Sequence, residues 1–174
     1  SSNFIAGLHR RPDVIVIGVT LTTVAGVTVV VVTGLDLLLT VLHPTRSGFM
    51  SRAATSAVWR SIHTTGSRFR MEFLVSYGGV LIMLGQLITW ILGFWLGFAM
   101  IYAGHLDQLA FLTSDGFGNP TVVDALYLSG ASLTTVGFGD LVAGTDTLRL
   151  VTVLEAACGL AVITSAVAYL LSVY

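Results

Sequence analysis

Three long apolar stretches constrain the fold of this chain more than any other feature of its sequence. They run from Val14 to Leu42, from Phe73 to Ala103 and from Thr147 to Tyr174. A helix of roughly 20 residues is long enough to cross the hydrocarbon core of a bilayer. Only 10% of the 174 residues are charged, against about 25% in ordinary soluble domains. The sequence therefore predicts an all-α membrane protein that crosses the cell membrane three times.

The polar segments between the spans differ in charge, and this difference predicts the topology. Residues 45–72 are rich in arginine, whereas the segment between the second and third spans is acidic and holds no basic residue before Arg149. By the positive-inside rule, residues 45–72 form a cytoplasmic loop, in which we expect a helix lying on the membrane surface. The N-terminus and the acidic segment are then external. The cytoplasmic arginines are Arg46, Arg52, Arg60, Arg68 and Arg70.

A short helix and an unusual loop lie between the second and third spans. Apolar spacing predicts a helix over residues 121–133, with Thr121 as its N-cap. This helix is too short to cross a bilayer, so we interpret it as re-entrant. The stretch TTVGFGD follows at residues 134–140. Gly137 and Gly139 permit backbone conformations that other residues resist, so this stretch can turn successive carbonyl groups to one side.

In this setting TTVGFGD resembles the filter signature of the pore-loop potassium channels, with Phe138 where tyrosine is commoner. The resemblance covers the pore domain, residues 73–174, and residues 1–44 add one N-terminal span to a small prokaryotic-type channel. It implies a homotetramer, because one loop supplies one quarter of a filter. The implied parts are an outer helix at 73–104, a pore helix at 121–133, a filter at 134–140 and an inner helix at 147–174.

The same resemblance implies roles for the residues of the loop. Gly139 would let the chain leave the filter, and Asp140 would attract cations at the outer mouth. The carbonyl groups that would bind K+ belong to Thr135, Val136, Gly137 and Phe138.

In the third span, the resemblance implies a gate and a cavity. Gly159 stands at the spacing of the hinge glycine in simple potassium channels. In the same register, Leu160, Ile163 and Val167 would line the cavity below the filter.

Filter support must differ from that of many relatives. Simple channels of this family often carry a glutamate behind the filter, where this chain has Ala131, and a tryptophan where it has Leu128. Glu155 lies near filter depth and, at ~100° per residue, points away from the cavity-lining stripe. We expect Glu155 to support the filter from the third span; the alternative is a buried carboxyl group without effect on conduction. Its candidate partners are Ser129, Ser132 and the backbone near Thr134.

These expectations combine into passive, selective conduction of K+ by a homotetramer in the bilayer. No enzyme activity, cofactor or nucleic-acid partner is implied, and K+ is the permeant ion. Three alternatives stay open: a cation channel that also passes Na+, a membrane subunit of a potassium transporter, and a non-conducting accessory protein. The transporter subunits carry four related loops on one chain, and this chain has one. The sequence indicates no gating stimulus.

Other polar and aromatic side chains are interpreted as structural. Trp90, Trp95 and Tyr102 are candidate interface anchors of the second span, whose aromatic stripe is otherwise read as a lipid-facing and packing surface. Asp36 is read as a snorkelling or capped carboxylate near the cytoplasmic end of the first span, with a functional role as the alternative. Cys158 is read as a small packing residue. Three of the four histidines, His43, His63 and His105, are interpreted as interfacial and not as ligands of a structural metal.

Overall fold

The computed structural model describes residues 12–42, 69–112 and 119–173. The surface helix expected between the first two spans, and with it His43 and His63, falls outside these residues. The elements in chain order are α1 (Pro12–Leu42), α3 (Phe69–Ala103), a 3-10 turn (Leu106–Gln108), β1 (Leu109–Phe111), α4 (Val122–Leu133), β2 (Leu141–Ala143) and α5 (Asp146–Val173).

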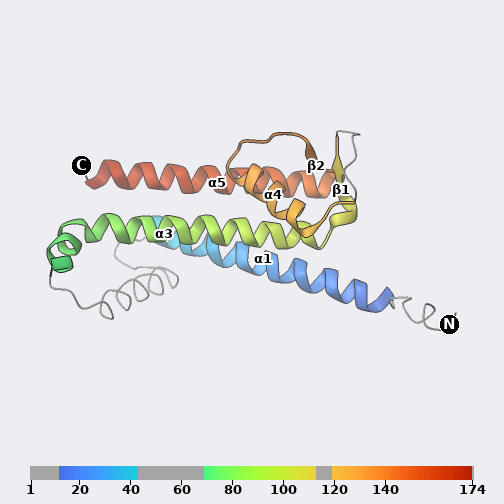
Figure 1. Ribbon diagram of the computed structural model, residues 1–174, viewed down its shortest axis with the longest axis horizontal. Helices are drawn as coiled ribbons and strands as arrows, with labels where there is room; N and C mark the ends of the chain where they lie inside the picture. Colours follow the sequence, from blue (N-terminus) through green and yellow to red (C-terminus); the bar gives the residue numbers. More distant parts are fainter. Residues whose placement is uncertain (1–11, 43–68, 113–118, 174) are drawn as a thin grey trace.

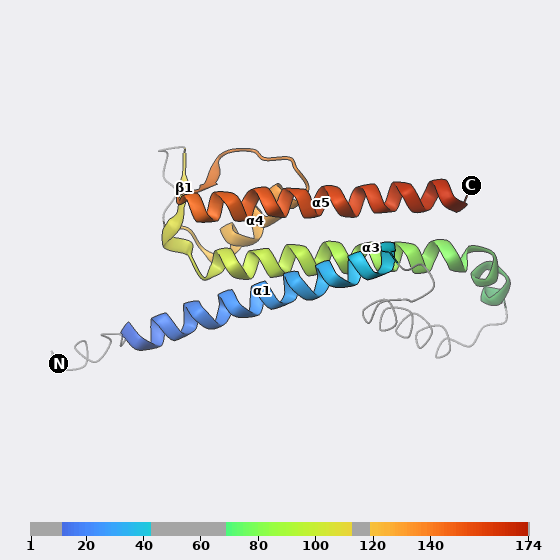
Figure 2. The same ribbon diagram turned by 180° about the vertical axis from the view of Figure 1, so that it is seen from behind.

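The three long helices confirm the predicted all-α membrane fold. Each contains an apolar stretch long enough to cross a bilayer: Val16–Val41 in α1, Met83–Ala103 in α3 and Asp146–Ala168 in α5. Helix α3 lies in the middle of the molecule, with α1 along one side and α4 and α5 along the other (Figure 1). Figure 2 shows the same order from behind. The first span therefore packs against the outer helix of its own chain.

Helices α1 and α3 approach closely where their small residues meet. A Cβ atom on Gly26 would lie 2.6 Å from the Gly97 carbonyl oxygen. On the same interface, a Cβ atom on Gly93 would lie 2.5 Å from the Thr33 hydroxyl oxygen. Small residues at such crossings let two membrane helices pack backbone to backbone, which is a main source of their association.

Asp36 is buried between α1 and α3 and does not snorkel. Its side chain is only 4% exposed, and its Oδ2 atom accepts hydrogen bonds from Gln86 Nε2 and Trp90 Nε1, both at 3.0 Å. A carboxyl group in an apolar span needs such donors, since an unpaired polar group is costly there.

Of the two interpretations of the aromatic residues in the second span, burial contradicts the interface anchors and agrees with the packing surface. Trp90 is 4% exposed and Tyr102 is fully buried. The half-buried Trp95 donates from Nε1 to the Leu126 carbonyl oxygen of α4 at 2.9 Å. These rings carry a donor that has to find an acceptor away from water, and the neighbouring helices provide it.

The short helix α4 starts as the sequence predicts. Thr121 is its N-cap residue, and the Asp124 carboxylate accepts from the Thr121 backbone amide and hydroxyl, both at 2.7 Å. Because these bonds satisfy a free helix end, they fix where the chain turns into α4.

A two-stranded antiparallel sheet that the sequence did not predict joins β1 to β2, with Leu109 opposite Ala143 and Phe111 opposite Leu141. Strands of three residues carry too little alternation to be recognised in a sequence. The sheet links the end of α3 to the start of α5, directly after the TTVGFGD stretch (Figure 1).

Candidate functional site

The backbone of the TTVGFGD stretch turns left-handed at every second residue. The φ angles are +58° at Thr135, +54° at Gly137 and +78° at Gly139. Glycine adopts these angles freely, whereas a β-branched threonine rarely does. Left-handed residues that alternate with right-handed ones gather the amide groups on one side, which leaves the carbonyl groups on the other.

The amide groups of this stretch point back to the C-terminal end of α4. Thr135 donates to the Ser132 carbonyl oxygen at 3.0 Å, while Val136 and Gly137 both donate to the Ala131 carbonyl oxygen, at 3.0 and 3.2 Å. These bonds satisfy the last carbonyl groups of the helix as well as the amides of the loop. The position of the stretch therefore depends directly on the position of α4.

The side chains of the stretch are not covered by the part of the chain that the structure describes. Every residue from Thr134 to Asp140 is exposed, and the apolar Val136 and Phe138 are 55% and 70% exposed. Apolar side chains gathered on an open surface mark a surface that another molecule covers.

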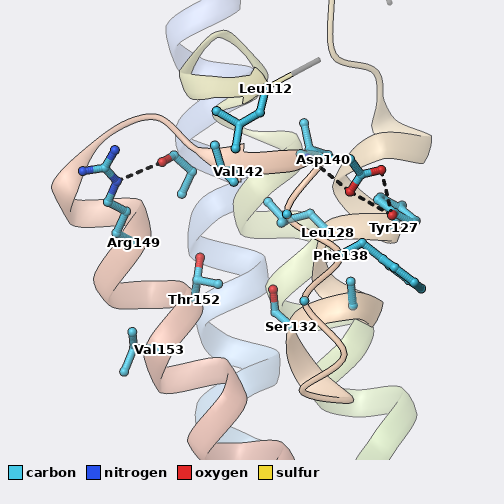
Figure 3. Close-up of a pocket in the computed structure, with 15 residues that line it drawn as sticks. Leu112, Tyr127, Leu128, Ser132, Phe138, Asp140, Val142, Arg149, Thr152 and Val153 are labelled. Carbon is cyan, nitrogen blue, oxygen red and sulfur yellow. Dashed lines mark hydrogen bonds between the residues drawn. The ribbon is translucent and has the colours of Figure 1, made fainter.

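Tyr127 fastens the outer end of the stretch to α4. Its hydroxyl group lies 2.9 Å from both carboxylate oxygens of Asp140, and its ring stacks on Phe138 with centroids 6.1 Å apart (Figure 3). Desolvation and the bond to Asp140 raise the pKa of the Tyr127 phenol above its usual value. Tyr127 was not among the residues predicted from the sequence. The signal available in the sequence was a tyrosine on the predicted pore helix that precedes an aspartate at the end of the loop.

Glu155 lies at the centre of a buried polar cluster behind the stretch. Its side chain is fully buried, and it is hydrogen-bonded to the Ser129 hydroxyl of α4 at 2.5 Å and to the Tyr102 hydroxyl of α3 at 2.7 Å. The Ser129 hydroxyl also lies 2.9 Å from the Trp95 carbonyl oxygen, and the Tyr102 hydroxyl lies 3.2 Å from that of Thr152. The cluster thus joins three helices.

Among the partners considered for Glu155, the structure selects Ser129. Ser132 accepts the Thr135 amide with its backbone carbonyl group, and the Thr134 hydroxyl donates to the Gly130 carbonyl oxygen at 2.7 Å. Tyr102 was missed as a partner, because the sequence places its ring on the second span without showing which helix that ring faces.

Gly159 allows α5 to touch the last residue of α4. A Cβ atom at this position would overlap the carbonyl oxygen of Leu133. The close approach is an observed reason for a glycine here, and the hinge role stays a prediction.

The expected cavity-lining residues lie on an open face of α5. Leu160 is 58% exposed, and Ile163 and Val167 are each 51% exposed. Glu155 and Gly159, by contrast, are buried against α3 and α4. Like the TTVGFGD stretch, this face has no cover within the described part of the chain.

A hollow of about 450 Å³ separates the stretch from the N-terminal half of α5. Ser132, Thr152, Val153 and Arg149 border it in Figure 3, and Arg149 donates from Nε to the Ala143 carbonyl oxygen at 3.2 Å. Within the described residues, the backbone hydrogen bonds that hold Thr135, Val136 and Gly137 come from α4. Within residues 12–42, 69–112 and 119–173, no group of three or more His, Cys, Asp or Glu side chains could hold a metal ion.

Comparison with known proteins identifies a family whose model matches this part of the chain. Residues 86–174 match the model of a family described as ion channel, and this segment covers α4, the TTVGFGD stretch, α5 and most of the membrane-crossing part of α3. The chain is also 30% identical over 128 residues to an uncharacterized membrane protein YdjJ of Bacillus subtilis (strain 168). That match covers 73% of this chain and 36% of the relative's length. No solved structure matches the chain.

Proposed function

This chain belongs to the ion channel family, and on that premise we propose that it conducts K+ selectively through a filter formed by Thr135 to Phe138 of four identical subunits. It would work passively, with K+ moving down its electrochemical gradient and no reaction catalysed. Asp140, exposed beside the stretch, would raise the local concentration of cations at the outer mouth.

The observation that carries the proposal is the left-handed backbone at Thr135, Gly137 and Gly139. Together with amide groups tied back to α4, it frees a run of carbonyl oxygens to face a common axis. Stacked rings of such oxygens can replace the hydration shell of K+.

The proposal of several subunits is supported by the fact that one chain cannot form a closed ring of carbonyl oxygens. One chain supplies one stretch, and a closed ring of oxygens around an ion needs several. The exposed Val136 and Phe138, and the exposed apolar face of α5 at Leu160, Ile163 and Val167, would be covered by neighbouring copies or would line the pore. Four copies is the number that the resemblance to potassium channels implies.

Reversal potentials of the purified protein in planar bilayers test the proposal. With K+ on one side and Na+ on the other, we expect unitary currents that reverse near the K+ equilibrium potential. A reversal near zero would instead support the alternative of a cation channel that passes Na+ as well. Absence of unitary currents would support an accessory protein or a transporter subunit.

A matched pair of glycine variants tests the role of the backbone. A Cβ atom would meet nothing within 4 Å at Gly137 or at Gly18, but only Gly137 has a positive φ. An L-residue in the left-handed conformation costs roughly 1–2 kcal/mol, in each of four subunits. We expect Gly137→Ala to abolish K+ selectivity and Gly18→Ala to leave it unchanged. Equal behaviour of both variants would contradict the proposed filter.

A further inference from the structure

Helix α5 touches α4 at two points that lie one helical turn apart. Glu155 meets Ser129, and Gly159 meets Leu133. The two members of each helix are four residues apart, so they lie one above the other on the same face. One polar contact and one close backbone approach therefore fix how α4 lies along α5.

This register reaches the proposed filter through the backbone. Helix α4 ends at Leu133, and the Ala131 carbonyl oxygen in its last turn accepts the amides of Val136 and Gly137. A displacement of α4 against α5 would therefore move the residues proposed to bind K+.

A count of hydrogens around Glu155 indicates which form of its carboxyl group fits. The Trp95 and Leu148 carbonyl oxygens can only accept. An ionised Glu155 can only accept as well. The hydroxyl groups of Ser129, Tyr102 and Thr152 then supply three hydrogens, one each, for four contacts shorter than 3 Å. If the carboxyl group is protonated, it donates to Ser129, and every one of the four is satisfied. These contacts are Ser129–Trp95 O, Ser129–Glu155, Tyr102–Glu155 and Thr152–Leu148 O.

We propose that Glu155, as a neutral carboxylic acid, is the positioning residue that clamps the pore helix α4 to α3 and α5 and so holds the filter in register. One carboxyl oxygen donates to Ser129 and the other accepts from Tyr102. The inference rests on the proposed function, because a filter must be present for the clamp to hold.

Substitutions at Glu155 separate this role from simple filling of space. Glutamine offers the same pattern as a neutral carboxylic acid, with one group that donates and one that accepts, whereas valine offers neither. We expect Glu155→Val to lower the K+ to Na+ permeability ratio about tenfold, since it leaves the buried Tyr102 hydroxyl without its acceptor and the Ser129 hydroxyl oxygen without its donor. Glu155→Gln should stay within about twofold of the wild type. Loss of selectivity in both variants, or in neither, would overturn the proposal.

Three single-hydroxyl variants keep the test decisive if Glu155→Val does not assemble. Ser129→Ala and Tyr102→Phe each remove one bond to Glu155, and both should lower the permeability ratio. The matched control is Thr152→Val, which removes no bond to Glu155: it loses the 3.2 Å contact with Tyr102 and the hydroxyl bond to the Leu148 carbonyl oxygen within α5. It should leave the ratio unchanged. An equal effect of all three variants would mean that the cluster only fills space.

Infrared absorption tests the proton independently of ion preference. The wild type should show a carboxylic acid band that shifts in D2O and is missing from Glu155→Gln. Absence of that band from the difference spectrum would contradict a neutral Glu155. A wild type that carries the band but does not select K+ would instead contradict the proposed function and leave the protonated clamp standing.

Discussion

At the scale of single residues, Thr135 has a backbone conformation that its residue type does not predict. The positive φ values at Gly137 and Gly139 fit the conformational freedom that their residue type predicts. Thr135 adopts the same region against its own preference, at a cost on the order of 1–3 kcal/mol. The bond from its amide to the Ser132 carbonyl oxygen helps to hold it there. Strain of this kind is set by the surrounding structure, so the sequence could not reveal it.

Tyr127 gives a prediction at the same scale. Tyr127→Phe keeps the ring that stacks on Phe138 but removes the hydrogen bonds to Asp140. We expect the loss of about 1 kcal/mol of support to make the outer end of the filter less stable. Macroscopic currents recorded from liposome patches at constant voltage should then decline faster than those of the wild type.

Asp140→Asn is the matched variant for this prediction. It removes the charge but keeps an oxygen that can accept from Tyr127. We therefore expect it to lower the unitary conductance more than it changes the decline, because the charge attracts cations and the bond holds the backbone. If Tyr127→Phe currents decline at the wild-type rate, the hydrogen bond does not support the filter.

At the scale of elements, what could be predicted depends on length. Long apolar runs identified α1, α3 and α5, and the N-cap at Thr121 marked the start of α4. The strands β1 and β2 were missed because each has only three residues. The packing of α1 on α3, and the burial of Trp90 and Tyr102, depend on which helix faces which. An apolar run that is hydrophobic on every side does not encode that orientation.

Gly159→Ala is the prediction at this scale. A hinge role predicts altered open probability with unchanged ion preference, since alanine only stiffens the helix. The close approach to Leu133 adds a second effect, because the new methyl group would push the end of α4 and the proposed filter attached to it. We therefore expect Gly159→Ala to lower both the open probability and the K+ to Na+ permeability ratio in single-channel recordings.

A double variant distinguishes the two effects. Ala157 is exposed on α5, so Ala157→Gly restores flexibility near the hinge without restoring the close approach. We expect Ala157→Gly/Gly159→Ala to keep the altered ion preference of the single variant. Complete recovery of both properties would show that flexibility alone is what Gly159 provides.

At the scale of the whole molecule, the three helices give the protein two distinct ends. The start of α1, the end of α3, the two strands and the start of α5 gather at one end, and the C-terminal part of α5 lies at the other (Figures 1 and 2). Asp107, Asp140 and Asp146 lie at the first end, and all three are exposed. Helix α1 ends and α3 begins toward the opposite end, and the arginine-rich residues lie between these two helices in the sequence. The positive-inside rule thus predicts that the end with the strands is external.

Cysteine labelling of intact cells tests this orientation. In a Cys158→Ala background, a cysteine replacing Asp107 should react with a membrane-impermeant reagent, and one replacing Ser67 should not. Both should react once the cells are permeabilised, which controls for access to the thiol. The reverse pattern on intact cells would invert the topology.

The two contacts between α5 and α4 also limit which sequence changes between Glu155 and Gly159 are compatible with this packing. Glu155 can contact Ser129 while Gly159 lies against Leu133 only if three residues separate Glu155 from Gly159. One residue inserted or deleted between them would rotate one contact about 100° away from the other. Exchanges of Ala156 and Ala157, which are not fully buried, leave that spacing intact. We therefore expect relatives that share this packing to differ in the identity of the residues between the two positions and not in the number of these residues.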